Sequence, residues 1–250
     1  MIPAVIISEQ RTGSNLLMCQ LDQHKDIKNF GEVFSKKQLS AIPDGLTRPE
    51  YIEKKGTDPA GLIKHWICSK TDLDGKPPVH MFKFQYHNIK SKPGKETIKY
   101  LHEIGSHARI IHLVRQNAFE RFVSKLNAEK TRKYYVSKAS EKPKEPDPYR
   151  IERNIAERGM KHYLRDVKMV DELIRDMPYT KTVYYEELVN ARENVIDTLF
   201  QFLQIEPMVT SVVSQKQSIP SRFQIKNYAA LRDHFKETAY AEYFEESPGY

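Results

Sequence analysis

The sequence predicts an α/β fold in which a central parallel sheet is flanked by helices. Short apolar runs, typical of strands buried on both faces, alternate along the 250 residues with segments whose apolar residues recur at helical spacing. This alternation favours parallel strands, because each helix carries the chain back across the sheet. The length suits one α/β domain, and the chain contains no repeats and no clear domain boundary.

The first strand is predicted at residues 4–7, and a helix follows it after a tight loop. Leu16, Leu17 and Leu21 recur at helical spacing, and the loop before them reads Arg-Thr-Gly-Ser-Asn at residues 11–15. Such a turn directs backbone N–H groups and the positive end of the helix dipole at one point. Since Arg11 adds a permanent charge that can hold two oxygens, the loop indicates a site for a phosphate-type anion. It lacks the Walker pattern and the G-x-G-x-x-G pattern, so an ordinary strand-to-helix turn remains the alternative.

A second strand and helix repeat this arrangement further along the chain. The strand is predicted at residues 109–114, Arg115 follows it directly, and Asn117 begins a helix. Ser124 lies outside the apolar stripe of that helix, so its hydroxyl can share a ligand with Arg115. Parallel strands of this kind bind ligands at their carboxyl ends. The two arginines, Arg11 and Arg115, therefore suggest a ligand with two separate phosphate-like groups.

The other elements are predicted from the same periodicities and from proline positions. A Pro-rich charged segment cannot continue a helix, and Pro178 ends the longest helical pattern. In chain order we expect short helices and loops at 36–78, a strand at 79–85, a helix at 95–104, an exposed loop at 133–150, a helix at 151–177, a strand at 182–185 and a helix at 195–203.

Composition excludes several classes of protein. The chain has two cysteines without a Cys-x-x-Cys pair, which predicts neither a disulfide framework nor a zinc site. Apolar runs are too short to span a bilayer and Met1 leads directly into the first strand, so we expect no signal peptide, no membrane association and a cytoplasmic location. The net charge of +7 leaves a nucleic-acid-binding module as an alternative, but no RRM, KH or zinc-finger signature supports it. A basic run at residues 125–144 is read as a solvated surface, with a lid or an attractive surface for an anionic acceptor as the alternative.

Several short motifs, in this order and spacing, resemble the sulfotransferases that use 3′-phosphoadenosine 5′-phosphosulfate (PAPS). Residues 10–17 look like the arginine version of the family's first loop, and 113–115 with 122–124 are similar to its second signature. Weaker matches lie at 29–34, 127–131 and 183–188. The variant is closest to bacterial carbohydrate sulfotransferases of the trehalose type. The resemblance implies a P-loop-like three-layer fold and a single domain over 1–250, with an acceptor-shaping insertion at 36–78 and a mobile loop at 133–150.

The resemblance also implies a set of nucleotide-binding residues. The 5′-phosphosulfate would be held by Arg11, Thr12, Gly13, Ser14, Asn15 and Leu16. Arg115 and Ser124 would hold the 3′-phosphate, and Tyr185 matches a family tyrosine near the adenine, with a core tyrosine as the alternative. No Gly-rich basic segment is found near the C-terminus, and Lys216 or Arg222 would close over the nucleotide in its place.

The implied reaction moves a sulfuryl group from PAPS to a hydroxyl or amine and releases PAP. Glu32 matches the glutamate proposed as base in trehalose-type enzymes, His87 is the rival base, and a structural salt bridge is the alternative role for Glu32. Lys83 would neutralise the sulfuryl oxygens, and no metal is expected. We expect a carbohydrate or small-molecule acceptor of unknown identity and no nucleic-acid partner, and the sequence leaves the oligomeric state open. A nucleoside or sugar kinase is the rival enzyme, but it needs Mg²⁺ ligands and a Lys-containing loop that are not evident.

Overall fold

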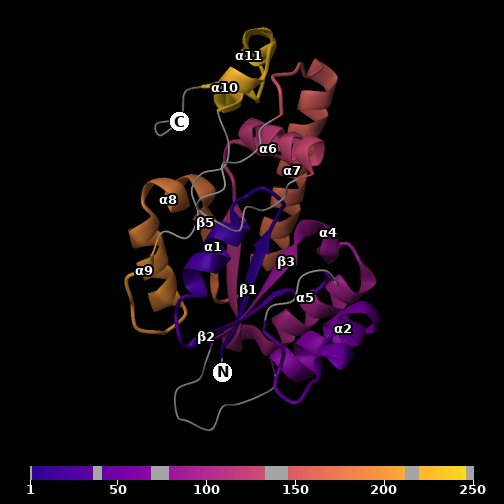
Figure 1. Ribbon diagram of the computed structural model, residues 1–250, viewed down its shortest axis with the longest axis vertical. Coiled ribbons are helices and arrows are strands. Elements are labelled where there is room, and N and C mark those ends of the chain that lie inside the picture. The colour runs from indigo at the N-terminus through magenta and orange to yellow at the C-terminus, as the bar shows by residue number, and fades with distance from the viewer. Residues whose placement is uncertain (1, 36–40, 69–78, 133–145, 212–219, 246–250) are drawn as a thin grey trace. The chain divides into compact units, whose positions relative to one another are not determined.

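The structure is a computed structural model that describes residues 2–35, 41–68, 79–132, 146–211 and 220–245 (Figure 1). The chain divides into two compact units. The first unit comprises Met1–Val114 and Val170–Ser211, and the second comprises Arg115–Met169 and Val212–Tyr250. Within the described ranges, no helix combines the length and the apolar character needed to cross a membrane.

The first unit is built on a five-stranded sheet with the order β2-β3-β1-β4-β5. All neighbouring strands are parallel, with Ala4 opposite both Met81 and Arg109. The predicted parallel sheet is therefore confirmed. The strands are β1 (Ile2–Ser8), β2 (Ile27–Glu32), β3 (Val79–Gln85), β4 (Arg109–Val114) and β5 (Thr180–Tyr184).

Strand β2 is the one strand of the sheet that the apolar pattern did not predict. Its sequence, Ile-Lys-Asn-Phe-Gly-Glu, is interrupted by polar residues and a glycine, which an edge strand tolerates because only one of its sides is paired. Its pairing with β3 shifts between Asn29 and Glu32, where Gly31 has a φ of 62°. After this bulge Glu32 lies opposite Lys83.

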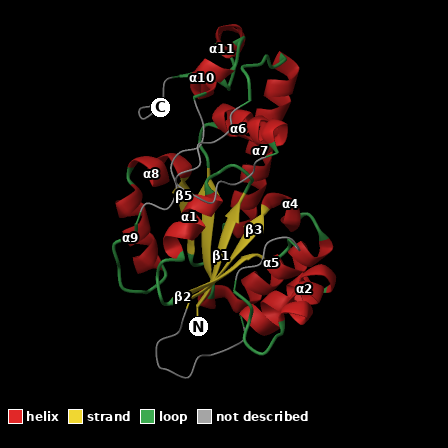
Figure 2. Cartoon of the chain, viewed as in Figure 1, coloured by secondary structure: helices red, strands yellow, loops and turns green. Residues whose placement is uncertain are grey.

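One face of the sheet is covered by three helices: α1 (Ser14–Leu21), α8 (Tyr185–Asn190) and α9 (Arg192–Phe202) (Figure 2). Leu17 of α1, Leu188 of α8 and Phe200 of α9 are buried with Ala4 and Ile6 of β1 in one core cluster. Side chains alternate along a strand, so the other residues of β1 face the opposite layer. This arrangement makes the fold three-layered, as expected.

The opposite face carries α4 (Tyr86–Ile89) and α5 (Lys92–Ile104) (Figure 2). Helix α5 begins before the predicted residue 95, because Ser91 caps it by accepting the backbone N–H of Gly94 at 3.2 Å. Packed beyond it are α2 (Arg48–Thr57), α3 (Pro59–Leu62) and the short helix Ile63–Ile67, while Gly105–His107 forms one 3₁₀ turn after α5. These helices are the described part of the segment 36–78, whose residues 36–40 and 69–78 lie outside the described residues.

The second unit is helical: α6 (Ala118–Thr131), α7 (Arg153–Ile174, whose last turn belongs to the first unit), α10 (Ser221–Gln224), α11 (Tyr228–Phe235) and the 3₁₀ turn Ala241–Phe244. Asn117 caps α6 as predicted, accepting the backbone N–H of Glu120 at 2.8 Å. Phe244 packs against Phe119 and Phe235, with ring centroids 4.4 and 5.4 Å apart. Most of the loop expected at 133–150 lies outside the described residues, and Tyr149 at its end donates a hydrogen bond to Asn127 at 2.8 Å.

Candidate active site

The loop after β1 turns sharply into helix α1. Arg11 has a φ of 68° and Gly13 a φ of 88°, both in the left-handed region, and Gly13 is the N-cap of α1. A left-handed residue followed by a helical one turns successive N–H groups toward one point. A Cβ atom on Gly13 would lie 2.5 Å from Cδ2 of Tyr185, so only glycine fits beneath the tyrosine ring. The loop therefore turns tightly into α1, and Tyr185 packs directly on it.

The loop side chains divide into inward and site-facing groups. Thr12 is fully buried and donates its hydroxyl to the Glu9 carbonyl at 2.8 Å, which fixes the turn from inside. Leu16 packs against the core of the first unit. Ser14 and Asn15 instead accept hydrogen bonds from a lysine of β3. Because these two polar groups face a buried cation, the loop is tied to the neighbouring part of the sheet.

That cation is Lys83, which is 3% exposed. Its Nζ lies 2.5 Å from Oε1 of Glu32, 3.0 Å from Oδ1 of Asn15 and 3.3 Å from Oγ of Ser14. An ammonium has three N–H donors, and here three acceptors surround it. Lys83 thus joins the predicted phosphosulfate loop to the predicted base.

Glu32 is held by a second donor as well. Its carboxylate, 15% exposed, accepts a hydrogen bond at Oε1 from Nε2 of Gln85 at 2.7 Å. Gln85 follows Lys83 by two residues, and its backbone N–H donates to Oδ1 of Asn88 at 3.0 Å, where α4 begins. Its side-chain oxygen lies 3.5 Å from Nε2 of Gln10. The carboxylate therefore sits in a fixed position at the end of the sheet.

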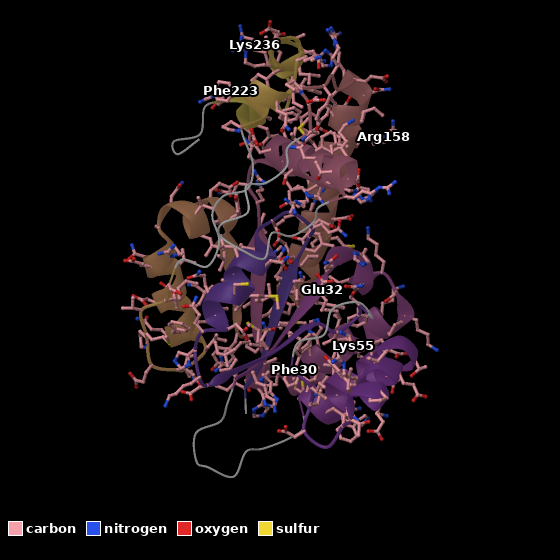
Figure 3. All side chains as sticks on the ribbon, viewed as in Figure 1. Phe30, Glu32, Lys55, Arg158, Phe223 and Lys236 are labelled. Carbon is pink, nitrogen blue, oxygen red and sulfur yellow. The ribbon has the colours of Figure 1, made fainter. Side chains whose placement is uncertain are left out.

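Lys55 of α2 is a further charged residue of the first unit and interacts with Glu32. Both residues are labelled in Figure 3, together with Phe30. The side chain of Lys55 is 3% exposed, and its Nζ lies 5.3 Å from the ring centre of Tyr51. Burial lowers the pKa of Lys55 to about 8, and the negative charge of Glu32 opposes that decrease. The sequence carries no signal for this residue, because a helical lysine is ordinarily solvated.

A pocket of about 400 Å³ opens beside the carboxylate. Both candidate bases border it: Glu32 from β2 and the exposed His87 from α4. The remaining lining residues are polar apart from one phenylalanine: Gln10, Phe34, Ser35, Gln85 and Asn88. Gln10, Gln85 and Asn88 were not among the predicted site residues. The sequence could have indicated them, because they lie at or just after the carboxyl ends of the predicted strands, close to predicted site residues.

The second predicted arginine, Arg115, belongs to the second unit and is 2% exposed. Its backbone is fixed on both sides by the Tyr163 hydroxyl, which accepts from the Arg115 N–H at 2.8 Å and donates to its carbonyl at 2.9 Å. A guanidinium nitrogen lies 3.8 Å from Oε2 of Glu120, whose Oε1 accepts the backbone N–H of Ser221 at 2.9 Å. Ser124, one helical turn beyond Glu120, is also buried, with 6% exposed. Arg115 and Ser124 are therefore both buried residues of the second unit.

The two remaining predicted residues belong to the C-terminal part of the chain. The guanidinium of Arg222, in α10, lies 4.9 Å from the ring centre of Phe223. Lys216 lies outside the described residues. In the described residues, no three His, Cys, Asp or Glu side chains are arranged to hold a metal ion.

Strand order places the predicted anion loop at a position typical of ligand sites. The chain leaves β1 toward β2 on one side and leaves β4 toward β5 on the other, so the order reverses between the neighbouring ends of β1 and β4. A parallel sheet of this order with a tight loop after its first strand defines an α/β protein of the P-loop-like class. The model of the sulfotransferase family matches residues 3–210, and the chain belongs to that family. A comparison with curated proteins finds no match.

Several solved structures are similar to the chain at low sequence identity. The sulfotransferase from Alicyclobacillus acidocaldarius is 15% identical, with 96% of this chain and 93% of that chain covered and a TM-score of 0.48. The sulfotransferase domain of the Synechococcus PCC 7002 olefin synthase is 15% identical, with 98% and 96% covered and a TM-score of 0.43. Mouse sulfotransferase SULT7A1, in a complex with PAP, is 12% identical, with 99% and 89% covered and a TM-score of 0.49.

Proposed function

We propose that this sulfotransferase uses PAPS as donor and transfers its sulfuryl group to a hydroxyl or amine of a carbohydrate or another small polar molecule. The observation that carries the proposal is the cluster around Lys83. One buried ammonium contacts two side chains of the anion loop and a carboxylate that borders a pocket. Such a cluster combines binding of a transferable anionic group with acceptance of a proton, which are the two demands of this reaction.

The loop fits a phosphosulfate in its backbone and in its charge. We infer that an anion binds beneath Tyr185 from three features of the loop. Arg11 and Gly13 are left-handed, a Cβ atom on Gly13 would clash with Tyr185, and helix α1 begins directly after Gly13. We assign the 5′-phosphosulfate to Arg11, Gly13, Ser14 and Asn15, with Thr12 and Leu16 supporting the turn from inside. Arg11 would offset the negative charge that the leaving phosphate gains.

We assign the 3′-phosphate to Arg115 and Ser124. The support is that both residues are buried in the second unit and that the Tyr163 hydroxyl fixes the backbone of Arg115. Tyr185 would contact the nucleotide from its place on the loop. We also propose that Lys216 or Arg222 closes over the nucleotide.

We propose Glu32 as the base and Lys83 as the partner of the sulfuryl oxygens. Glu32 accepts the proton of the acceptor hydroxyl, the acceptor oxygen forms the new bond to sulfur, and the bond from sulfur to the 5′-phosphate oxygen breaks with its electron pair on that oxygen, releasing PAP. Glu32 is preferred to His87 because two donors fix its carboxylate beside the pocket, whereas His87 is exposed.

The pocket chemistry supports a polyhydroxylated acceptor. Amide groups of Gln10 and Asn88 and the hydroxyl of Ser35 can exchange hydrogen bonds with several hydroxyls, and Phe34 offers an aromatic face for the apolar side of a sugar ring. We propose that residues 36–78, which continue directly from this pocket wall, shape the acceptor site within a single sulfotransferase domain.

The decisive experiment is transfer of ³⁵S from labelled PAPS to a panel of sugars, phenols and amines. We expect label in at least one acceptor with the wild-type protein, and transfer that is slower by about 10²–10³-fold with Arg11→Ala. Transfer of ³²P from labelled ATP with Mg²⁺ to the same acceptors, without transfer from PAPS, would replace the proposal with a kinase.

A further inference from the structure

Lys83 cannot add a ligand without losing one of the partners it has now. Its three N–H donors face Glu32, Asn15 and Ser14, and the side chain is buried, so no fourth partner can be added at its Nζ. A sulfuryl oxygen of the donor, bound at the loop, would have to replace one of the three. Ser14 and Asn15 belong to the loop that the donor itself would occupy. The partner of Lys83 that does not belong to that loop is the Glu32 carboxylate of β2.

Glu32 has a second anchor that does not depend on Lys83. Gln85 donates to the same oxygen, Oε1, at 2.7 Å. Gln85 is itself fixed, because its backbone N–H donates to Oδ1 of Asn88 and the residue is buried, with 8% exposed. If Lys83 turned away, the carboxylate would keep its position but would lose its closest positive charge.

We propose that Lys83 makes the proton-accepting strength of Glu32 depend on the presence of the donor, and that Gln85 is the positioning residue that holds Glu32 when Lys83 turns to the sulfuryl group. This inference rests on the proposed function. Without donor, the ammonium of Lys83 lies 2.5 Å from the carboxylate of Glu32. With donor, the positive charge moves to the sulfuryl oxygens, and Glu32 becomes a stronger proton acceptor. Proton removal from the acceptor is thereby restricted to the donor-bound enzyme.

Two other ionisable groups lie near Glu32, and neither is part of the loop. Lys55 lies on α2 and interacts with Glu32 through its charge, and His87 lines the same pocket from α4. Lys83 is the group whose ammonium contacts both the loop and Glu32. A change in proton affinity on donor binding therefore reports on Lys83.

The test is calorimetric measurement of proton uptake when nucleotide binds at pH 6, in two buffers with different ionisation enthalpies. PAPS and PAP are compared on wild type and on Glu32→Gln, because subtracting the Glu32→Gln value removes protons taken up or released by the nucleotide phosphates. We expect a Glu32-dependent uptake of a fraction of a proton with PAPS and none with PAP, which lacks the sulfuryl group. The PAPS uptake should disappear in Lys83→Met.

Equal Glu32-dependent uptake with PAP and PAPS would overturn the inference, and so would its persistence in Lys83→Met. The wild-type comparison of the two nucleotides needs no Lys83 variant, so a folding defect in that variant leaves the test valid. If PAPS binds and is used but no uptake occurs, this coupling alone is wrong. If neither nucleotide binds, the proposed function is wrong as well.

The role of Gln85 is tested by Gln85→Met, which keeps length and removes the amide. We expect kcat to fall at least tenfold with unchanged PAP affinity, since Glu32 loses its anchor only in the donor-bound state. Gln20→Met is the matched control: Gln20 is also buried and its amide binds the Ser211 carbonyl at 3.0 Å, but it lies outside the site. That control should lower Tm without lowering kcat. The reverse result for Gln85→Met, a lower Tm with wild-type kcat, would reduce Gln85 to a structural residue.

Discussion

Lys83 and Lys55 are both buried lysines of the first unit, each with 3% of the residue exposed. Lys83 has a carboxylate at 2.5 Å and two further acceptors, so its charge is compensated. Nζ of Lys55 lies 5.3 Å from the ring centre of Tyr51, and burial lowers the pKa of Lys55 to about 8, against the opposing effect of the Glu32 charge. A buried lysine with a lowered pKa costs stability and is therefore a candidate for a functional rather than a structural role.

Replacing Lys55 should stabilise the fold at neutral pH. The folded-state pKa of about 8 lies below the ordinary value of 10.5, so the unfolded chain binds the proton more tightly and the cost is fully present below pH 8. By linkage this cost in the free energy of unfolding is on the order of 3 kcal/mol. The cation–π contact of Lys55 with Tyr51 offsets part of it. We expect Lys55→Met to raise Tm by a few degrees at pH 7 and by less at pH 10. A lower Tm at pH 7, measured by calorimetry, would show that the buried ammonium is net stabilising.

The two arginines should differ in what their loss affects. Arg11→Ala removes a charge that opposes the growing charge of the leaving phosphate, so kcat should fall by about 10²–10³-fold, by analogy with lost oxyanion donors. Arg115→Ala removes a contact to a phosphate that does not react, so PAP affinity should fall and kcat much less. Arg158→Ala, an exposed arginine of α7 labelled in Figure 3, is the control and should change neither. The affinity for PAP is measured by calorimetry. If Arg115→Ala binds PAP as tightly as wild type, the assignment of the 3′-phosphate to Arg115 is wrong.

The base should be identified by two conservative substitutions. Glu32→Gln keeps the shape of the side chain but removes the proton acceptor, so PAP binding should persist while kcat falls by about 10²–10⁴-fold. His87→Gln should be mild, as should Glu53→Gln, which removes an exposed carboxylate of α2. If the His87→Gln variant were inactive and the Glu32→Gln variant active, His87 would be the base.

At the level of elements, the turn from β3 into α4 is held by contacts of the buried residues Tyr86 and His112 and of the half-exposed Asp171. The Tyr86 hydroxyl lies 2.6 Å from Nε2 of His112 in β4, and Nδ1 of the same ring lies 2.9 Å from Oδ1 of Asp171. The aspartate fixes the tautomer: Nδ1 carries the proton and Nε2 accepts from Tyr86. Since Tyr86 follows Gln85 directly, this network holds the segment that anchors Glu32.

That network predicts a pH dependence of stability. Burial lowers the pKa of His112 below its ordinary value of 6.5, an effect that the Asp171 charge and hydrogen bond only partly oppose. A lowered histidine pKa means that the unfolded chain protonates first, so stability falls as the pH decreases below about 6.5, by up to about 1.4 kcal/mol per pH unit. In urea unfolding between pH 7 and 5, His112→Gln should show a shallower decrease than wild type. An identical slope would mean that His112 does not titrate in this range.

At the scale of the whole molecule, binding of the nucleotide is expected to stabilise the folded protein. A molecule that binds only the folded state adds about 2.7 kcal/mol when its concentration is a hundred times its dissociation constant, which corresponds to a rise in Tm of roughly 5–11 °C for a chain of about this length. We expect PAP to raise Tm by such an amount and AMP or ADP by far less, because they lack the 3′-phosphate. Equal stabilisation by ATP with Mg²⁺, in the same thermal scan, would contradict the proposed nucleotide.

The sequence alone was sufficient for the elements whose signal is local. A continuous apolar run marks a strand buried on both faces, which is why β3 and β4 were predicted with their observed bounds, and a side-chain cap marks the start of α6. The tight loop between β1 and α1 was predicted for the same reason: its glycine, its arginine and the helix after it are consecutive in the chain. The family resemblance added the assignment of Arg115 and Ser124 to the 3′-phosphate and the proposed role of Glu32 as base.

Only the tertiary structure decided which side chains meet. Strand β2 has no apolar pattern of its own, because an edge strand is specified by its partner β3, and a bulge in that pairing sets Glu32 opposite Lys83. The hydrogen bond from Gln85 to Glu32 and the burial of Lys55 join residues more than 20 positions apart. No periodicity encodes such contacts, since they depend on strand order and packing. The sequence therefore determined the loop and the sheet, and the fold determined the charged cluster around Lys83 on which the proposed chemistry depends.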